Sequence, residues 1–439
     1  MRKRLSIMTF PARRNEGYPF QPQRWRQVKA RIDSQLRKTP RLHKWVRWSW
    51  TTGKWLMLSC KCRIATLFAS DIAKAIGINK TLWVSPKKIV YCSSRDFGIY
   101  DFKGAVIGGN WDRRGRKFDD LDVYVAFKEV FMEGKSWPET VFYQRIQDSL
   151  KTREFLYDCA DRNAIERTCE ELEALFWAIK SEGYKSQREL RRLATDDEVT
   201  ISIGRNGELL FSSGAHRLAI AKLLGIERIP VTVAVRHPGW ITFVEDLLNY
   251  SGRLDCVTHP DLRDIPALHR CEDRFMMIKH NMSAKGGRLL DLAASLGYFC
   301  HRFEDEGFEC YAVEDSKERL YFLQRLRKAE NKKFKIMAGS IGEWPQVDKM
   351  RFDVVLALNV FHHALKTKYS CSQLATQLNR LNVRELFFET PNDADSQMKD
   401  AYRKYTPSEF VQFIMRNSKF KKAALIGKTE DDTTMYRLS

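Results

Sequence analysis

Short apolar runs separated by helix-like stretches dominate the C-terminal part of the chain. The segment GRLLDLAASLGYF, residues 287–299, passes from an apolar strand through a turn of small residues into a helix. The next segment, EDEGFECYAVEDS, supplies a second strand that ends in acids. Further apolar runs lie in KFKIMAGSI, FDVVLALNVFHHAL and VRELFFETP, and FKKAALIGKTEDDTTMYRLS adds two more. Strands that alternate with helices in this way predict an α/β domain with a Rossmann-like sheet.

A different succession of elements fills ISIGRNGELLFSSGAHRLAIAKLLGIERIPVTVAV, residues 201–235. Two strands joined by a glycine turn precede a helix with near-helical apolar spacing, and a buried strand follows. Gly214 permits the tight bend before the helix, and Gly225 ends it. His216 and Arg217 then fall in the first helical turn, where free backbone N–H groups favour an anion. An arginine there can donate two hydrogen bonds to the oxygens of a phosphate. The alternative is an ordinary structural unit in which Arg217 pairs with a surface carboxylate.

Positive charge is concentrated in residues 1–64, which contain seventeen Lys or Arg against two acids and so carry 15 of the net charge of +20. The remainder of the chain is nearly neutral. The same segment holds five tryptophans: Trp25, Trp45, Trp48, Trp50 and Trp55. Tryptophan between cations suits an anionic membrane surface, which we place first as the partner of this segment. Nucleic acid is the second candidate, and an acidic face of the same protein is the third.

Composition and cysteine usage limit the classes of protein that fit this sequence. With 439 residues and 44% apolar content, the chain can form two cores and an extension. Its ten cysteines show no paired framework, and the close pair Cys60 and Cys62 lacks the further ligands of a zinc site. We therefore expect reduced thiols and no metal centre. No apolar run of about 18 residues is present, so the sequence predicts a cytoplasmic protein, peripheral at most to the inner face of the membrane.

The segment SGAHRLAIAKLLGIERIPVTV resembles the signature of the ParB and sulfiredoxin superfamily, in which a G-x-H-R or G-x-x-R turn opens a helix over nucleotide phosphates. The resemblance implies an α+β domain that binds a nucleotide or phosphate through Gly214, His216 and Arg217, with a nucleoside triphosphate and Mg²⁺ as the implied ligand. Ala215 stands where sulfiredoxins have their nucleophilic cysteine, so sulfinic acid chemistry is not expected. Asp112, in GGNWD, is a candidate metal ligand or base, with a solvated turn aspartate as the alternative.

The C-terminal strand order resembles class I S-adenosylmethionine-dependent methyltransferases over residues 265–439. The family's first motif, D/E-x-G-x-G-x-G, is represented here by Asp291, Ala293, Ser295 and Gly297, so two glycines are replaced by other small residues. The resemblance implies that this turn binds the cofactor. Glu314, 23 residues after Asp291, would then take the ribose hydroxyls.

The remaining site residues follow from the same resemblance and from the sheet edge. Ser340 and Ile341 would flank the adenine, and Asn359 with Phe361 would line the methionine side. His362, His363 and Glu389 end the fourth and fifth strands, at the edge where open α/β sheets bind ligands. Histidine is suited to general-base work, and we place His362 slightly ahead of His363. Methyl transfer also depends on alignment, so an enzyme without an essential base is the alternative.

The expected organisation is a basic, Trp-rich extension (1–75), a ParB/sulfiredoxin-like domain (76–240), a helical linker (241–264) and a class I methyltransferase domain (265–439). The predicted function is methyl transfer to a small-molecule, glycan or lipid-linked acceptor. The alternative is a DNA-associated module that methylates nucleic acid or protein. The tetrapeptide N/D-P-P-Y/F of nucleic-acid amino-methylases is absent from the fourth strand end, which favours the first function.

Overall fold

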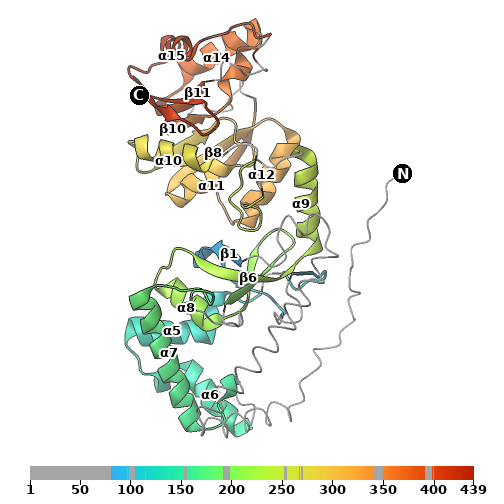
Figure 1. Ribbon diagram of the computed structural model, residues 1–439, viewed down its shortest axis with the longest axis vertical. Helices are drawn as coiled ribbons and strands as arrows, with labels where there is room; N and C mark the ends of the chain where they lie inside the picture. Colours follow the sequence, from blue (N-terminus) through green and yellow to red (C-terminus); the bar gives the residue numbers. More distant parts are fainter. Residues whose placement is uncertain are drawn as a thin grey trace, which may run out of the picture. The chain divides into compact units, whose positions relative to one another are not determined.

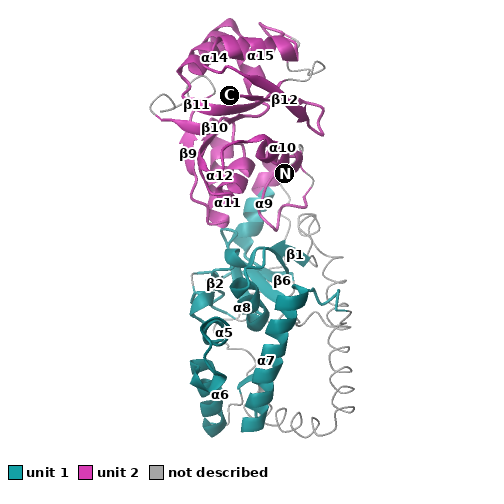
Figure 2. Cartoon of the chain, turned by 90° about the vertical axis from the view of Figure 1, so that its left-hand side faces the viewer, with its two compact units in different colours: residues 1–245 teal, residues 246–439 magenta. Residues whose placement is uncertain are grey.

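The structure is a computed structural model that describes residues 81–95, 97, 104–113, 115–152, 156–190, 198–251, 255–265, 267, 270–340, 350–390, 398 and 400–439. The chain divides into two compact units, Met1–Glu245 (unit 1) and Asp246–Ser439 (unit 2) (Figure 2). The division falls inside the segment 241–264 that was predicted as a linker. The basic extension, with its tryptophans, Cys60 and Cys62, lies outside the described residues.

Unit 1 is built on a mixed six-stranded sheet with the order β1-β6-β4-β5-β2, in which β3 also pairs with β6 (Figure 1). Its strands are β1 (Thr81–Val84), β2 (Tyr91–Cys92), β3 (Ala105–Val106), β4 (Val199–Ile203), β5 (Leu209–Ser213) and β6 (Ile229–Arg236). The central strand β6 runs parallel to β3 and β4 and antiparallel to β1. The predicted hairpin is β4 paired antiparallel with β5. Both β4 and β6 are buried along their whole length, as their apolar runs indicate.

Helices occupy most of the chain between β3 and β4. They are α5 (Asp122–Glu133), α6 (Val141–Thr152) and α7 (Arg162–Glu182), with short 3-10 turns at Phe118–Asp120, Trp137–Glu139 and Leu156–Asp158. A further 3-10 turn, Pro86–Lys88, lies between β1 and β2. Aromatic rings join these helices, and Phe131 stacks on Phe176 with a centroid distance of 3.8 Å. Two later helices, α8 (Ala215–Leu223) and α9 (Pro238–Ser251), follow β5 and β6. The predicted succession of hairpin, helix and buried strand is therefore confirmed.

Unit 2 contains a seven-stranded sheet with the order β12-β13-β11-β10-β7-β8-β9. Its strands are β7 (Gly287–Asp291), β8 (Phe308–Glu314), β9 (Lys335–Ala338), β10 (Phe352–Ala357), β11 (Val383–Thr390), β12 (Ala423–Lys428) and β13 (Thr434–Leu438). Strands β7 to β11 are mutually parallel, whereas β13 inserts antiparallel between β11 and β12. The five parallel strands have the reversing order of a doubly wound fold. This confirms the predicted Rossmann-like sheet.

Helices cover both faces of this sheet. They are α10 (Glu272–Asn281), α11 (Tyr298–Asp305), α12 (Lys317–Ala329), α13 (Phe361–Ala364), α14 (Lys368–Arg380) and α15 (Pro407–Arg416). Successive strand residues face opposite sides, so Leu289 and Val354 pack with α10 and α11, while Leu290 and Val355 pack with α14 and α15. Both faces are therefore buried, which leaves the strand ends to supply a site.

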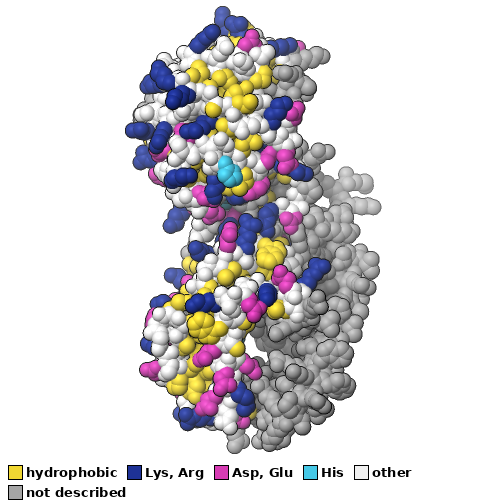
Figure 3. All heavy atoms as spheres, turned by 60° about the vertical axis from the view of Figure 1, so that its left-hand side comes forward, with side chains coloured by type: hydrophobic (Ala, Val, Ile, Leu, Met, Phe, Trp, Pro, Cys, Tyr) yellow, Lys and Arg dark blue, Asp and Glu magenta, His cyan; other side chains and the backbone are white. Residues whose placement is uncertain are grey.

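One prediction about the cysteines is wrong. Cys256 and Cys271 form a disulfide with a Cα–Cα distance of 6.2 Å, so these two residues are not reduced thiols. Their separation of 15 residues gave no recognised spacing in the sequence. Within the described part of the chain, no helix is both long and apolar enough to cross a bilayer. The visible face in Figure 3 shows Lys and Arg interspersed with Asp and Glu.

Candidate active site

The turn between β7 and α11 is held in an unusual backbone conformation. Ser295 has φ 47° and Gly297 has φ 83°, both in the left-handed region. For a non-glycine residue such as Ser295 this conformation costs on the order of 1 kcal/mol. A side chain at Gly297 would force Leu323 to move, because a Cβ there would lie 2.4 Å from Leu323 Cδ1, and it would also be strained in the left-handed backbone. The turn is tied to neighbouring strands by hydrogen bonds from Leu292 N to Leu356 O and from Ala294 N to Val313 O.

Two buried acids end adjacent strands beside this turn. Asp291 is 2% exposed, and burial raises its pKa to about 7 although the Ala293 N–H donates to it. Its Oδ2 is buried without a hydrogen-bond partner among the described residues. Glu314 is 4% exposed and accepts from the N–H groups of Ser295, Asp315 and Ser316. Burial raises the pKa of Glu314 and the three N–H groups oppose that rise.

The other predicted cofactor residues lie at the same sheet edge. Ser340 follows β9, and the preceding Gly339 donates its N–H to Glu314 O, which brings this segment beside the acid. Ile341 lies outside the described residues. Asn359 follows β10 with φ 49°, so two non-glycine residues on neighbouring strand ends share the left-handed conformation. The Phe361 ring is fully buried in the core, 6.4 Å from the Phe388 ring, and packs as a core side chain.

The three predicted bases have different surroundings. His362 and His363 lie in α13 with ring centroids 4.0 Å apart; His362 is 1% exposed, whereas His363 is exposed. Glu389 is buried at the end of β11 and accepts from Arg274 Nε at 2.6 Å. Burial raises the pKa of Glu389 even though the Arg274 guanidinium lowers it. Of the three side chains, His363 alone is exposed.

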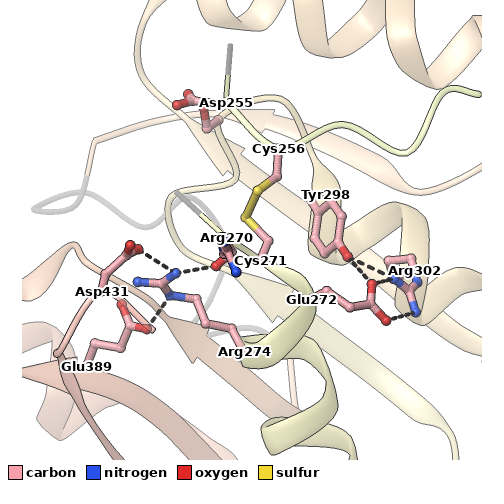
Figure 4. The surroundings of a disulfide bond; sticks show 11 residues. Asp255, Cys256, Arg270, Cys271, Glu272, Arg274, Tyr298, Arg302, Glu389 and Asp431 are labelled. Atoms are coloured by element: carbon pink, nitrogen blue, oxygen red, sulfur yellow. Dashed lines mark hydrogen bonds and ion pairs between the residues drawn. A yellow bond between two sulfur atoms is a disulfide. The ribbon is translucent and has the colours of Figure 1, made fainter. Parts of the chain in front are cut away.

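Several residues of this region were not anticipated from the sequence. Arg274, in the first turns of α10, joins Glu389 and Asp431, and Figure 4 shows its guanidinium between the two carboxylates. Asp255 accepts a hydrogen bond from Ser295 Oγ at 2.5 Å and precedes the disulfide cysteine Cys256. A serine at a glycine position of the motif was the signal that the turn needs outside support. Nothing in the sequence indicated which residue would supply it.

The helix-opening turn of unit 1 has the predicted backbone but different side-chain partners. Gly214 has φ 87°, and a Cβ there would lie 2.9 Å from Val199 Cα. Arg217 is 7% exposed, lies 3.3 Å from Glu198, donates to Lys185 O and stacks over the Tyr184 ring at 4.3 Å. Its partner is a carboxylate, as the second interpretation expects, but a buried one.

His216 lies among aromatic rings, including Phe127 at 6.0 Å and Tyr157 at 5.5 Å between centroids. Burial lowers its pKa to about 4, so the imidazole is neutral near pH 7 and brings no positive charge to a phosphate. In the described residues, both polar side chains of the turn are thus turned toward the protein. Phosphate binding by this turn stays a prediction.

Asp112 is not a solvated turn residue in the structure, and its role as a metal ligand or base stays a prediction. It is 8% exposed and receives three hydrogen bonds from Arg205, from the backbone N–H, Nε and Nη2. Its pKa is lowered, because these bonds outweigh the effect of burial. Asp112 therefore fixes the β4–β5 turn to the GGNWD segment. Among the described residues, no group of three or more His, Cys, Asp or Glu side chains could hold a metal ion.

Comparisons with known proteins identify the class of unit 2. Residues 290–381 match the family described as methyltransferase domain. No curated protein matches the chain.

A crystal structure of monomeric WbdD is 19% identical with a TM-score of 0.38, covering 44% of this chain and 48% of that chain. A structure of the bifunctional kinase-methyltransferase WbdD is 18% identical with a TM-score of 0.39, covering 45% and 46%. A methyltransferase from Clostridium acetobutylicum ATCC 824 that depends on S-adenosylmethionine is 9% identical with a TM-score of 0.29, covering 38% and 89%.

The match to the methyltransferase domain covers β7 to α14, the part of the sheet that carries Asp291, Glu314 and Asn359. The chain therefore contains a segment that matches a methyltransferase domain. It spans about half the length of the WbdD chains to which it is similar. Unit 1 lies outside the family match, so its resemblance to ParB and sulfiredoxin proteins stays a prediction.

Proposed function

We propose that this methyltransferase acts on a small-molecule, glycan or lipid-linked acceptor at the edge formed by β7, β8 and β10. One observation carries the cofactor part of this proposal. The register places Asp291 between Leu356 of β10 and Ala312 of β8, so the buried acid with its unpartnered oxygen lies at the centre of that edge. A buried polar oxygen without a partner requires a ligand or water to satisfy it.

The residues present fit S-adenosylmethionine. Gly297 keeps the left-handed turn that opens α11 and lets the Leu323 side chain pack against it, which holds the turn at the sheet edge where the cofactor would bind. The Glu314 carboxylate accepts three N–H bonds and has further lone pairs. With these it would accept hydrogen bonds from the ribose hydroxyls. Ser340 would flank the adenine, and Asn359 would line the methionine side. When bound, the cofactor supplies a methyl group on a positively charged sulfur.

The acceptor would approach α13, which follows β10. His363 is the exposed histidine there, so it is better placed than His362 to take a proton from an acceptor hydroxyl. Glu389 pairs with Arg274 through Oε1, and its Oε2 is buried without a hydrogen-bond partner among the described residues, so Glu389 is the second candidate base in this proposal. The segment LNVFHH, without the tetrapeptide of nucleic-acid amino-methylases, supports a hydroxyl-bearing metabolite or glycan over a base.

The test has two parts and uses the full chain. Isothermal titration with S-adenosylmethionine is expected to show one binding event per chain, and a folded protein that gives no heat would contradict the cofactor site. Cofactor with a labelled methyl group is then incubated with separate glycan, lipid and nucleic-acid fractions. Transfer to a glycan or lipid fraction supports the proposal, and transfer to nucleic acid alone would replace it with the DNA-associated alternative.

A further inference from the structure

The cofactor turn is supported by a residue from outside the methyltransferase motif. Ser295 keeps a left-handed backbone, φ 47°, that an L-residue adopts at a cost in energy. Two hydrogen bonds fix it there: its N–H donates to Glu314 at 2.9 Å, and its Oγ donates to Asp255 at 2.5 Å. The first bond orients Glu314, the acid predicted to hold the ribose. Asp255 therefore influences Glu314 through Ser295.

Asp255 is itself anchored by the residue that follows it. Cys256 is bonded to Cys271, which directly precedes α10 (Figure 4). The start of α10 is fixed to the sheet and to α11, since Arg274 pairs with Glu389 and Asp431 while Glu272 accepts from Tyr298 and Arg302. The disulfide thus connects the residue after Asp255 to a helix start that these pairs hold in place.

We propose that Asp255 is a positioning residue for the cofactor turn, and that the Cys256–Cys271 disulfide keeps its carboxylate within reach of Ser295. The affinity for S-adenosylmethionine would then depend on the redox state of this bond. A dithiol supplies two electrons and two protons: the Cys256–Cys271 bond breaks, two thiols form, and the dithiol closes into its own disulfide. The inference rests on the proposed function, since it needs the turn to bind the cofactor.

A double-variant cycle tests the role of Asp255. In the oxidised full chain, Asp255→Ala is expected to weaken cofactor binding about tenfold, as loss of a charge-assisted hydrogen bond implies. Asp255→Asn keeps an acceptor oxygen and should lie between Ala and wild type. Glycine adopts the left-handed conformation without support, so Asp255→Ala in a Ser295→Gly background should have little effect. An equal loss in both backgrounds, or no loss in wild type, overturns the inference.

Titration after treatment with dithiothreitol tests the disulfide. Reduction of the wild type should lower the affinity toward that of Asp255→Ala, whereas reduced Asp255→Ala should lose nothing further. The paired variant Cys256→Ser with Cys271→Ser serves as the control, since dithiothreitol should not change its affinity. If mass spectrometry shows two new thiols and the wild-type affinity is unchanged, the redox part is wrong.

These outcomes separate the inference from the proposed function. An oxidised wild-type chain that is folded and binds no cofactor contradicts the function itself. A wild type that binds, alongside an Asp255→Ala variant that binds equally well, contradicts only the positioning role. Should the paired cysteine variant fail to fold, the wild-type reduction and the Asp255 cycle still decide, because neither needs that variant.

Discussion

Each unit contains a strand, a left-handed glycine and a helix in succession. The polar residues near that glycine, however, have different partners in the two units. In unit 1, Arg217 pairs with Glu198, donates to Lys185 O and stacks over the Tyr184 ring. In unit 2, Asp291 keeps a buried oxygen without a partner among the described residues, and Glu314 collects three N–H groups at the same edge. The charged side chain beside the turn is therefore paired within the protein in unit 1, whereas unit 2 keeps an acid oxygen without a partner among the described residues.

The difference shows that the turn geometry alone does not indicate a ligand. A glycine with positive φ and a following helix give free N–H groups in both units. The charged side chains differ: Arg217 of unit 1 is paired within the protein, whereas Asp291 of unit 2 keeps an unpartnered oxygen. The neutral His216 of unit 1 also buries its Nε2 without a hydrogen-bond partner among the described residues, so an unsatisfied group marks a candidate site in both units. Five substitutions test this difference between the two units.

The largest effect is expected for the ion pair that ends β11. Arg274→Met leaves Glu389 buried without its cation, and it should lower the free energy of unfolding by about 3–5 kcal/mol. Denaturant unfolding of the full chain measures this. The control is Arg270→Met, whose pair with Glu430 is exposed and should contribute no more than about 1 kcal/mol. A stable Arg274→Met variant that has lost methyl transfer would instead place Glu389 in the chemistry.

The second change removes the titration of Asp291. Its folded-state pKa of about 7 lies above the ordinary value of 3.8, so between these values the folded chain holds a proton that the unfolded chain has lost. Stability therefore falls as the pH rises through this window and stays low above it. Asp291→Asn cannot ionise, and its stability relative to wild type should rise across the window by up to about 4 kcal/mol. A difference that is constant with pH would show that Asp291 titrates normally.

The secondary structure of unit 2 and the positions of its two acids were largely predictable because both depend on local patterns. Apolar runs indicated the strands of the seven-stranded sheet and β4, β5 and β6 of unit 1, and the acids at residues 291 and 314 end their strands as the motif spacing indicated. The surroundings of His216 and Arg217 were not predictable, because Glu198, Tyr184 and the aromatic helices reach them from distant segments. Asp255 and the disulfide were missed for the same reason, since each acts through a contact that no local spacing encodes.

The third change compares two left-handed glycines of unit 2. Gly297→Ala forces a Cβ to within 2.4 Å of Leu323 Cδ1 and should destabilise the chain by about 3 kcal/mol through strain and overpacking. Gly307→Ala has φ +90° but no atom within 4 Å of its Cβ, so it isolates the backbone cost of about 1–2 kcal/mol. Equal losses in denaturant unfolding would mean that the turn has room for a side chain.

The fourth change concerns the predicted ribose acid. Glu314→Ala should weaken binding of S-adenosylmethionine by about 1.5–3 kcal/mol, the value of hydrogen bonds to a charged group. Isothermal titration of the full chain measures this. Glu309→Ala is the matched control on the same strand, because Glu309 is exposed and pairs with Arg288 and Lys335 instead. Unchanged affinity in Glu314→Ala would mean that the ribose binds elsewhere.

The smallest effect should come from Arg217, and its direction decides between the two interpretations of unit 1. Lysine cannot contact Glu198, Lys185 O and the Tyr184 ring together, so Arg217→Lys should lower the free energy of unfolding by about 1–2 kcal/mol. Arg228→Lys, at an exposed arginine of the same unit, should change it by less than about 0.5 kcal/mol. If instead Arg217→Lys leaves stability intact and abolishes binding of a fluorescent ATP or CTP analogue, the turn holds phosphate. The two turns would then be alike, and Arg217 would exchange Glu198 for the nucleotide when it binds.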